Sequence, residues 1–345
     1  MAWCRRHRPS TSHSWSRSCA TGSRPPHEGH LVKIAIILFN LGGPDSLEAV
    51  QPFLRNLFGD PAILRVPGFI RGPLASFLAR RRAPTARAIY DKIGGSSPIL
   101  GQTEAQARAL EETLGTSGDE GHEWRGYVCM RYWHPMTEAV VRSVERFKPE
   151  RIVLLPLYPQ FSTATTESSF KAWNDTAKFK VPVKVVKEYP TEPGFIAASV
   201  ALLKEGLAQA GNAPKRVLFS AHGLPERVIK AGDPYQSQVE QTAKAIADAV
   251  GGLDWSVCYQ SRVGPLKWIG PSTDAEIARA GAAKVSVVLY PLSFVSEHSE
   301  TLVELDIEYR HLADKVGVPA YVRVPTVGTH PLFIAGLARL VRDAL

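Results

Sequence analysis

The chain has 345 residues, of which 44% are hydrophobic and 21% are charged, a composition typical of a globular protein with room for two domain-sized units. No apolar run approaches the roughly 18 to 20 residues that a membrane-spanning helix needs. The net charge of +8 is uneven, because residues 1–30 hold five arginines against Glu28 alone and so carry half of it. The rest of the chain is too weakly basic to predict a nucleic-acid partner.

The N-terminal 30 residues are rich in Ser, Arg, His and Pro and contain no hydrophobic run, which excludes a secretory signal peptide. We expect a disordered extension or a start codon assigned too far upstream, with a transit-like targeting segment as the alternative. The four cysteines, Cys4, Cys19, Cys129 and Cys258, form no CxxC motif. They indicate reduced thiols and a cytoplasmic protein.

Beyond residue 31, β-branched apolar runs alternate with helical patterns, which predicts an α/β fold with parallel sheets. The same order of units occurs twice. The predicted strands lie at 33–39, 127–130, 151–159 and 183–186 in the first half, and at 216–220, 257–259, 284–291 and 321–324 in the second. We therefore expect two similar doubly wound, Rossmann-like lobes, 31–211 and 212–345, with a cleft where the carboxyl ends of their strands converge.

The first half carries an insertion of roughly 50 residues, at about 60–102, between its first two predicted strands. It mixes apolar residues such as Phe69 and Phe77 with a basic cluster, Arg80 to Arg82. That mixture suits an apolar ligand with acidic groups, or the surface of an anionic membrane. The alternative is a buried helix with a solvated basic end.

His222 lies two residues after the end of the predicted strand 216–220, and Gly223, which begins a turn, follows it. This position is at the carboxyl end of a strand, in the expected cleft. A histidine there can bind a metal or take up a proton near neutral pH. The alternative is a histidine that only caps the turn.

A run of carboxylates begins where another predicted strand ends. At about 100° per residue, Glu297, Glu300, Glu304 and Glu308 fall within roughly 80° of one another on a helix. A solvated charged face would explain this stripe. Since Leu302 and Leu305 bury another side, a ladder that passes hydrated cations or protons is the functional alternative.

Motifs of other enzyme classes are missing from the sequence, which contains no GxSxG, GxxxxGK[ST], HExxH or GxGxxG. The sequence therefore disfavours four functions: hydrolase, nucleoside triphosphatase, zinc protease and dinucleotide-dependent dehydrogenase. The glycine pairs at 42–43 and 94–95 are interpreted as tight backbone turns rather than phosphate-binding loops.

At this point the sequence resembles the ferrochelatase family from about Leu31 to the end. The matching segments are 38–44, 93–98, 130–135, 157–162, 219–225 with 232–235, and 294–302. The resemblance implies that His222 is the metal-site histidine and Glu300 its acidic partner, so that both are catalytic and both lie at the metal. It further implies a helix widened into a π-helix, a feature often found at functional sites.

The resemblance also implies roles for other residues. A proton or metal relay would comprise Glu297, His298, Glu304 and Glu308. Substrate-binding positions would be Tyr90, Arg131 and Leu41 in the porphyrin pocket, and Arg81, Arg82 and Ser97 near the propionates or the mouth. The insertion at 60–102 would be the lip of the active site.

The expected activity is that of a lyase which inserts Fe²⁺ into protoporphyrin IX to form protohaem, the last step of haem biosynthesis. Alternatives are coproporphyrin III as substrate, a related chelatase that loads cobalt or nickel into a precorrin-like tetrapyrrole, and a tetrapyrrole carrier without turnover. Some members hold an iron-sulfur cluster, but Thr163 occupies the mid-chain cysteine position and no cysteine follows Cys258. We expect no permanent cofactor, and peripheral membrane contact through the lip.

Overall fold

The computed structural model describes residues 30–116, 121–262 and 266–345. The extension predicted over residues 1–30 therefore lies outside the described residues, apart from His30, and so do Cys4 and Cys19. The fold described below is that of the unit from Leu31 to Leu345.

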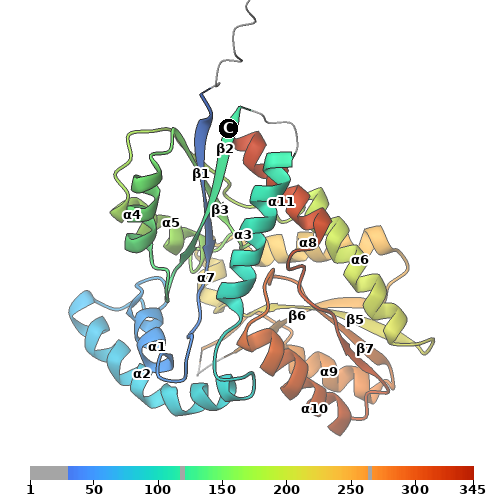
Figure 1. Ribbon diagram of the computed structural model, residues 1–345. Coiled ribbons are helices and arrows are strands. Elements are labelled where there is room, and N and C mark those ends of the chain that lie inside the picture. Colours follow the sequence, from blue (N-terminus) through green and yellow to red (C-terminus); the bar gives the residue numbers. More distant parts are fainter. Residues whose placement is uncertain (1–29, 117–120, 263–265) are drawn as a thin grey trace, which may run out of the picture. The chain divides into compact units, whose positions relative to one another are not determined.

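Two four-stranded parallel sheets form the framework of this unit (Figure 1). The first has the order β2-β1-β3-β4, and the second has the order β6-β5-β7-β8. The strands of the first sheet are β1 (Val32–Asn40), β2 (His122–Met130), β3 (Arg151–Pro156) and β4 (Val183–Val185); those of the second are β5 (Lys215–His222), β6 (Trp255–Gln260), β7 (Ser286–Pro291) and β8 (Tyr321–Arg323). The prediction of two similar doubly wound lobes with parallel sheets is confirmed.

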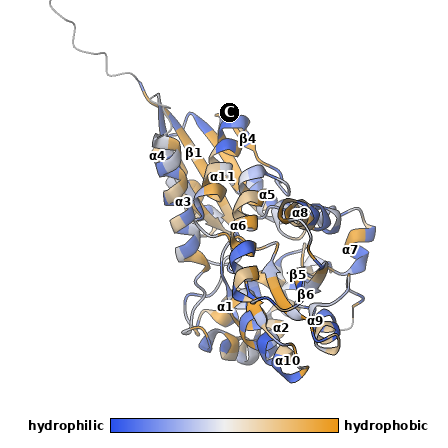
Figure 2. Cartoon of the chain, turned by 90° about the vertical axis from the view of Figure 1, so that its right-hand side faces the viewer, coloured by the Kyte–Doolittle hydropathy of each residue, from blue (hydrophilic) through white to orange (hydrophobic). Residues whose placement is uncertain are grey.

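The two inner strands of each sheet, β1 and β3 in the first and β5 and β7 in the second, carry buried apolar runs because helices cover both faces of the sheet. In β1, Ile36 pairs with Gly126 of β2 and with Val153 of β3, and its side chain is fully buried. Figure 2 shows β1 mostly in the apolar colour, while the helices around it also carry polar residues.

Helices occupy both faces of each sheet. The first sheet is covered by α3 (Ile99–Thr116) and α11 (Pro331–Ala344) on one face and by α4 (Thr137–Phe147) and α5 (Thr166–Thr176) on the other. The second is covered by α6 (Pro193–Gln209) and α8 (Tyr235–Val250) on one face, and by α9 (Thr273–Ala282), the π-helix η1 (Glu300–Glu308) and α10 (Tyr309–Lys315) on the other. The short helix α7 (Glu226–Lys230) follows β5.

Two helices pack across the division between the lobes. Helix α11 follows the second sheet in the chain, yet Phe333 and Leu337 belong to the core of the first sheet (Figure 1). Helix α6 follows the first sheet, yet Leu203 packs in the core of the second. The two helices approach closely at Gly194 and Gly336, where a Cβ on Gly194 would lie 2.9 Å from the Gly336 Cα. A division at residue 212 therefore separates the sheets but not the helices that cover them.

The predicted insertion contains one long helix, α2 (Gly68–Asp91), which packs against α1 (Val50–Gly59). The buried residues Ala75, Ala79 and Ala83 repeat every four positions and form the contact face. Phe69 and Phe77 are instead 81% and 59% exposed. The alternative of a buried helix with only a solvated basic end is therefore wrong, because both phenylalanines of α2 are exposed to solvent.

Asp60 anchors the start of this insertion. Its buried carboxylate accepts hydrogen bonds from Arg131 Nη2 at 2.6 Å and from the Tyr132 hydroxyl at 2.9 Å, and a further one from the Ser168 hydroxyl. Arg131 and Tyr132 directly follow β2, and Ser168 belongs to α5. One buried carboxylate thus fastens the insertion to the first lobe.

Two further expectations concern cysteines and membranes. Cys129 and Cys258 are both buried and form no disulfide. Among the helices of the described segments, none combines the length and the apolar character that crossing a membrane requires.

Candidate functional site

A cavity of about 790 Å³ lies where strands of both sheets end at their carboxyl termini. Its lining includes residues at, or just beyond, the carboxyl ends of five strands. These are Leu41 after β1, Leu157 and Tyr158 after β3, His222 at the end of β5, Ser261 and Arg262 after β6, and Ser293 after β7. Its volume lies within the usual range for small-molecule sites.

The cavity walls are largely apolar, and α1 and the lip together supply one side of them. Side chains from α1, α2 and the loop between them contribute Leu54, Leu57, Phe58, Ile63 and Ile89, and the second lobe contributes Leu224, Leu266 and Trp268. Four exposed arginines also line it, Arg65 and Arg82 from the lip and Arg227 and Arg262 from the second lobe. None of the four forms an ion pair with another described residue, so all four can bind ligand carboxylates.

A histidine and a carboxylate form a pair inside this cavity. His222 is the last residue of β5, and Glu300 is the first residue of η1, 78 positions later; Nδ1 of His222 lies 2.9 Å from Oε2 of Glu300. The His222 side chain is 40% exposed and the Glu300 side chain 27%, because both face the cavity. Bonding through Nδ1 leaves Nε2 of His222 available to a ligand.

The two groups shift each other's pKa in opposite directions. Burial lowers the pKa of His222, but the charge of Glu300 and the hydrogen bond to it outweigh burial, so the net shift is upward from 6.5. Burial raises the pKa of Glu300, but the charge and hydrogen bond of His222, with His298 nearby, lower it to about 2. Glu300 is therefore ionised at neutral pH.

These opposite shifts predict that the pair stabilises the fold most between pH 4.5 and 6.5. The lowered pKa of Glu300 gives stability that is present above its ordinary value of 4.5 and is lost as the pH falls toward 2. The raised pKa of His222 gives stability that is present below 6.5 and is lost as the pH rises through its folded value. Urea unfolding of wild type and Glu300→Gln across pH should show the largest difference inside this window; a difference that peaks in alkaline solution would contradict the prediction.

Further carboxylates continue from Glu300 along η1. Glu304 and Glu308 also line the cavity, and the π-helix implied by the resemblance is confirmed. The Ser261 backbone N–H donates to Glu304 Oε1 at 2.8 Å, and Glu308 Oε1 lies 3.4 Å from Lys92 Nζ at the exposed end of the row. Burial and the charge of Glu300 raise the pKa of Glu304. The row therefore offers two further acidic groups, Glu304 and Glu308, between the pair and solvent.

Glu297 lies away from this row, so the expected stripe of four carboxylates is wrong at its first member. Glu297 precedes the helix, and its Oε1 accepts hydrogen bonds from Arg323 Nη1 at 2.6 Å and from the Thr326 backbone N–H at 3.0 Å. Its charge is neutralised there by Arg323. His298 does line the cavity; its Nδ1 accepts from the Glu300 backbone N–H at 3.0 Å, and burial lowers its pKa.

The substrate-binding positions divide into two groups. Leu41 and Arg82 line the cavity, whereas Tyr90, Ser97, Arg81 and Arg131 are not among the lining residues. Tyr90 is buried between α1 and α2, accepts a hydrogen bond from the Ser299 hydroxyl at 3.4 Å, and has its pKa raised by burial to about 12. The Ser97 N–H donates to Pro44 in the loop after β1, and Arg131 is bound to Asp60.

Among the lining residues that sequence reasoning missed are Arg65, Arg227, Ser261 and Arg262. Ser261 and Arg262 directly follow a strand that was predicted, so the rule that placed His222 at a strand end could have found them. Arg65 and Arg227 lie in the lip and in α7, and no sequence pattern connects them.

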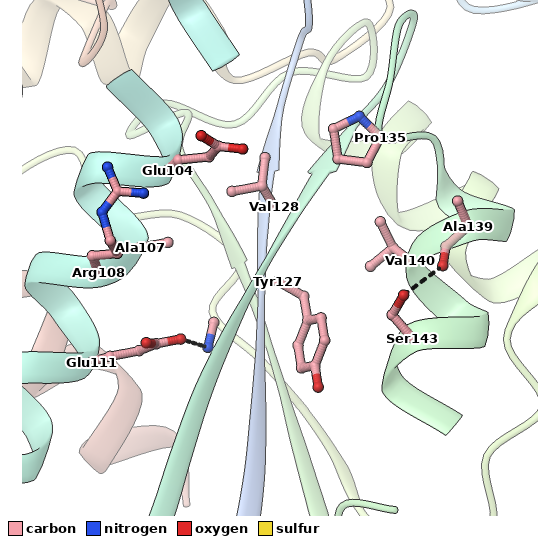
Figure 3. A pocket seen from close by; sticks show the side chains of 11 residues that line it. Glu104, Ala107, Arg108, Glu111, Tyr127, Val128, Pro135, Ala139, Val140 and Ser143 are labelled. Atoms are coloured by element: carbon pink, nitrogen blue, oxygen red, sulfur yellow. Dashed lines mark hydrogen bonds between the residues drawn. The ribbon is translucent and has the colours of Figure 1, made fainter. Parts of the chain in front are cut away.

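A second hollow of about 420 Å³ lies over the edge strand β2, between α3 and α4 (Figure 3). The Gly126 backbone N–H of this edge strand donates to the Glu111 carboxylate of α3, as the dashed line in Figure 3 shows. The carboxylate thereby occupies a donor that another strand could otherwise pair with. The lining contains no histidine or cysteine, and it shares no residue with the cavity at the strand ends.

The described residues contain no group of three or more histidine, cysteine, aspartate or glutamate side chains arranged to hold a metal ion. At position 163, the Thr163 hydroxyl donates to Asp233 Oδ2 at 2.7 Å. That position thus offers a hydroxyl engaged within the protein rather than a thiolate ligand.

The two parallel lobes, the cavity at their strand ends and the histidine–carboxylate pair together define a protein of the two-lobed chelatase class. The solved structure of SirB from Bacillus subtilis with Fe³⁺ has the same fold, with a TM-score of 0.51 at 12% identity over 91% of this chain and 96% of that one. The profile of the ferrochelatase family matches residues 33–345.

Relatives named ferrochelatase align along most of their length. The protein of Caulobacter vibrioides is 55% identical over 91% of this chain and 90% of its own length. That of Pelagibacter ubique is 49% identical over 90% of this chain and 91% of its own length. A Wolbachia protein is 51% identical over 90% of this chain and 98% of its own length. The chain belongs to the ferrochelatase family, which confirms the identification made from its motifs.

Proposed function

We propose that this ferrochelatase inserts Fe²⁺ into protoporphyrin IX and forms protohaem in the last step of haem biosynthesis. The observation that carries the proposal is the His222–Glu300 pair, 2.9 Å apart, within an apolar cavity of about 790 Å³. The apolar walls suit the face of a porphyrin, and the four arginines suit its carboxylates.

Metallation exchanges one Fe²⁺ for the two pyrrole protons of the porphyrin. His222 is the better proton acceptor of the pair, because its pKa is raised from 6.5 while that of Glu300 is lowered to about 2. Glu300 supplies the negative charge that stabilises the protonated histidine and attracts the incoming cation. We assign the acceptance of the pyrrole protons to His222 and the attraction of Fe²⁺ to the charge of Glu300.

The row of carboxylates provides a route between the pair and solvent. Glu304 is linked to the pair through Ser261, and Glu308 reaches the exposed Lys92. We assign proton or cation transfer to Glu304 and Glu308, with His298 beside them. Glu297, neutralised by Arg323, is assigned a structural role at the start of the helix.

A flat porphyrin directs its nitrogen lone pairs into the ring plane, where an approaching ion reaches them poorly. Binding the ring in a bent form would expose these lone pairs to Fe²⁺, and binding energy from the rest of the ring can offset the distortion. The lip and the second lobe supply opposed apolar walls for this purpose. The arginines around the cavity would then hold the carboxylates fixed.

The test is anaerobic metallation of protoporphyrin IX and of coproporphyrin III, followed by the absorption of the haem product. We expect many turnovers with Fe²⁺ and protoporphyrin IX, at a higher kcat/KM than with coproporphyrin III. A preference for coproporphyrin III would correct the substrate. Product that stops at one equivalent per protein would indicate a carrier.

We also propose that the enzyme works without a permanent cofactor. Thr163, bound to Asp233, stands where an iron-sulfur cluster would need a thiolate. Protein purified anaerobically should contain no acid-labile sulfide and no visible absorption of a cluster; stoichiometric sulfide would contradict the proposal.

Peripheral membrane contact is proposed for the lip. Phe69, Ile70 and Phe77 of α2 are exposed beside the exposed cluster Arg80 to Arg82. Apolar side chains flanked by cations bind anionic lipid surfaces. The intact protein should sediment with phosphatidylglycerol-containing vesicles, and neutralising Arg80 to Arg82 with glutamine should reduce the bound fraction.

The matched control replaces three exposed lysines outside the lip, Lys180, Lys184 and Lys204, with glutamine. This control removes the same charge and should leave vesicle binding unchanged. Absence of binding by the intact protein, or equal losses in both triple variants, would contradict lip-mediated contact.

A further inference from the structure

Ser261 has a backbone conformation that needs an explanation. Its φ of 59° lies in the left-handed region, which side chains other than that of glycine rarely adopt. Two other non-glycine residues in the described segments share this conformation, Lys148 and Lys284. Each of them follows the end of a helix, α4 and α9, where a left-handed residue commonly terminates the helix. Ser261 follows a strand instead.

The contacts of Ser261 show what this conformation achieves. Its backbone N–H donates to Glu304 Oε1 at 2.8 Å, its hydroxyl lies 3.0 Å from Glu300 Oε2, and the same hydroxyl contacts Glu304 Oε2. The left-handed backbone thus directs the N–H toward Glu304 and the hydroxyl toward both Glu304 and Glu300. Backbone strain that persists beside a functional site is evidence of a role there.

The contacts of Glu300 are all on one of its oxygens. Oε2 lies near His222 Nδ1, at 2.9 Å, Ser261 Oγ, at 3.0 Å, and Gln260 Nε2, at 3.4 Å. No donor from the described residues contacts Oε1. With one oxygen held by three groups, the carboxylate cannot rotate freely, and the other oxygen remains available within the cavity.

We propose that Ser261 is a positioning residue that holds Glu300 and Glu304 side by side and so keeps Oε1 of Glu300 available to the incoming metal ion. This inference rests on the proposed function and deepens it, because it assigns separate tasks to the two oxygens of one carboxylate. Ser261 acts through Glu300 and does not itself bind the metal. A residue that only shapes the turn after β6 would need the backbone conformation but not the hydroxyl.

Two substitutions separate these roles. Ser261→Gly removes the hydroxyl and tolerates the left-handed backbone, whereas Ser261→Ala removes the hydroxyl and keeps the strain. We expect both to raise the KM for Fe²⁺ by about tenfold, the size of effect typical of a lost hydrogen bond to a charged group. The KM for porphyrin should stay within about twofold of wild type, since neither change alters the apolar walls. A Fe²⁺ KM that is unchanged in both variants would overturn the proposal.

A second measurement does not depend on turnover. With ¹⁵N-labelled histidine, the Nδ1 proton of His222 should be observed by NMR in wild type and should exchange with water at least about tenfold faster in both variants, because Glu300 is no longer held toward it. The control Lys284→Gly removes a left-handed side chain outside the site and should change neither KM nor exchange. If wild type metallates no porphyrin, the proposed function fails, while equal exchange rates in wild type and variants would overturn the positioning role.

Discussion

Replacing His222 with alanine is expected to lower the rate of Fe²⁺ insertion by about 100-fold to 10,000-fold, the usual range for loss of a positioned acid–base group. The substitution removes the proton acceptor and also leaves Glu300 without the partner 2.9 Å away that lowers its pKa. Glu300→Gln should cause a loss of similar size, because it keeps the shape of the side chain and removes its charge. The measurement is kcat in the anaerobic assay at saturating porphyrin and Fe²⁺.

The matched control for His222 is His311→Ala, since His311 is an exposed histidine of α10 outside the cavity. It should retain the wild-type rate. Circular dichroism should confirm that the His222 and Glu300 variants keep their secondary structure. Rates near that of wild type in either variant would remove that residue from the mechanism.

Replacing Asp60 with alanine should lower the free energy of unfolding by about 3 to 5 kcal/mol, the cost of removing one member of a buried ion pair. The side chains of Arg131 and Asp60 are 21% and 3% exposed, and their 2.6 Å contact would be lost. The Tyr132 and Ser168 hydroxyls would lose their acceptor as well. Such a loss is a large part of the 5 to 15 kcal/mol by which a protein is usually stable.

Urea unfolding provides the measurement for Asp60, and Asp175→Ala provides the control. Asp175 pairs with Lys171 at 2.7 Å on the surface of α5, where both side chains are more than 60% exposed. Its loss should cost less than about 1 kcal/mol. Equal effects of the two substitutions would show that the Asp60 network does not hold the insertion in place.

Most of the framework could be predicted from the sequence, because each strand is a local pattern. The runs at 33–39 and 216–220 lie within β1 and β5, and the repeated order of units gave the shared sheet topology. His222 and Glu300 were placed in one cleft because parallel strands end on the same side of a sheet. The distance between them required the structure, since 78 residues separate them.

Features that depend on distant contacts could not be predicted. The burial of Arg131 against Asp60 joins positions 71 residues apart, and the resemblance alone had suggested a ligand contact for Arg131. Glu297 was misplaced because a helical wheel assumes that the helix has already begun, whereas η1 starts at Glu300. The packing of α11 on the first sheet has no local signal, because an amphipathic pattern predicts that a face is buried but not which sheet buries it.

The position of α11 also fixes the order in which the protein can be completed on the ribosome. Chains usually fold from the N-terminus as they are synthesised. Here, one apolar face of the first sheet is covered in part by α3 and in part by Phe333, Leu337 and Val341 of α11, which are translated about 150 residues after β4. The part of this face that α11 covers therefore stays unprotected until almost the whole chain has been made.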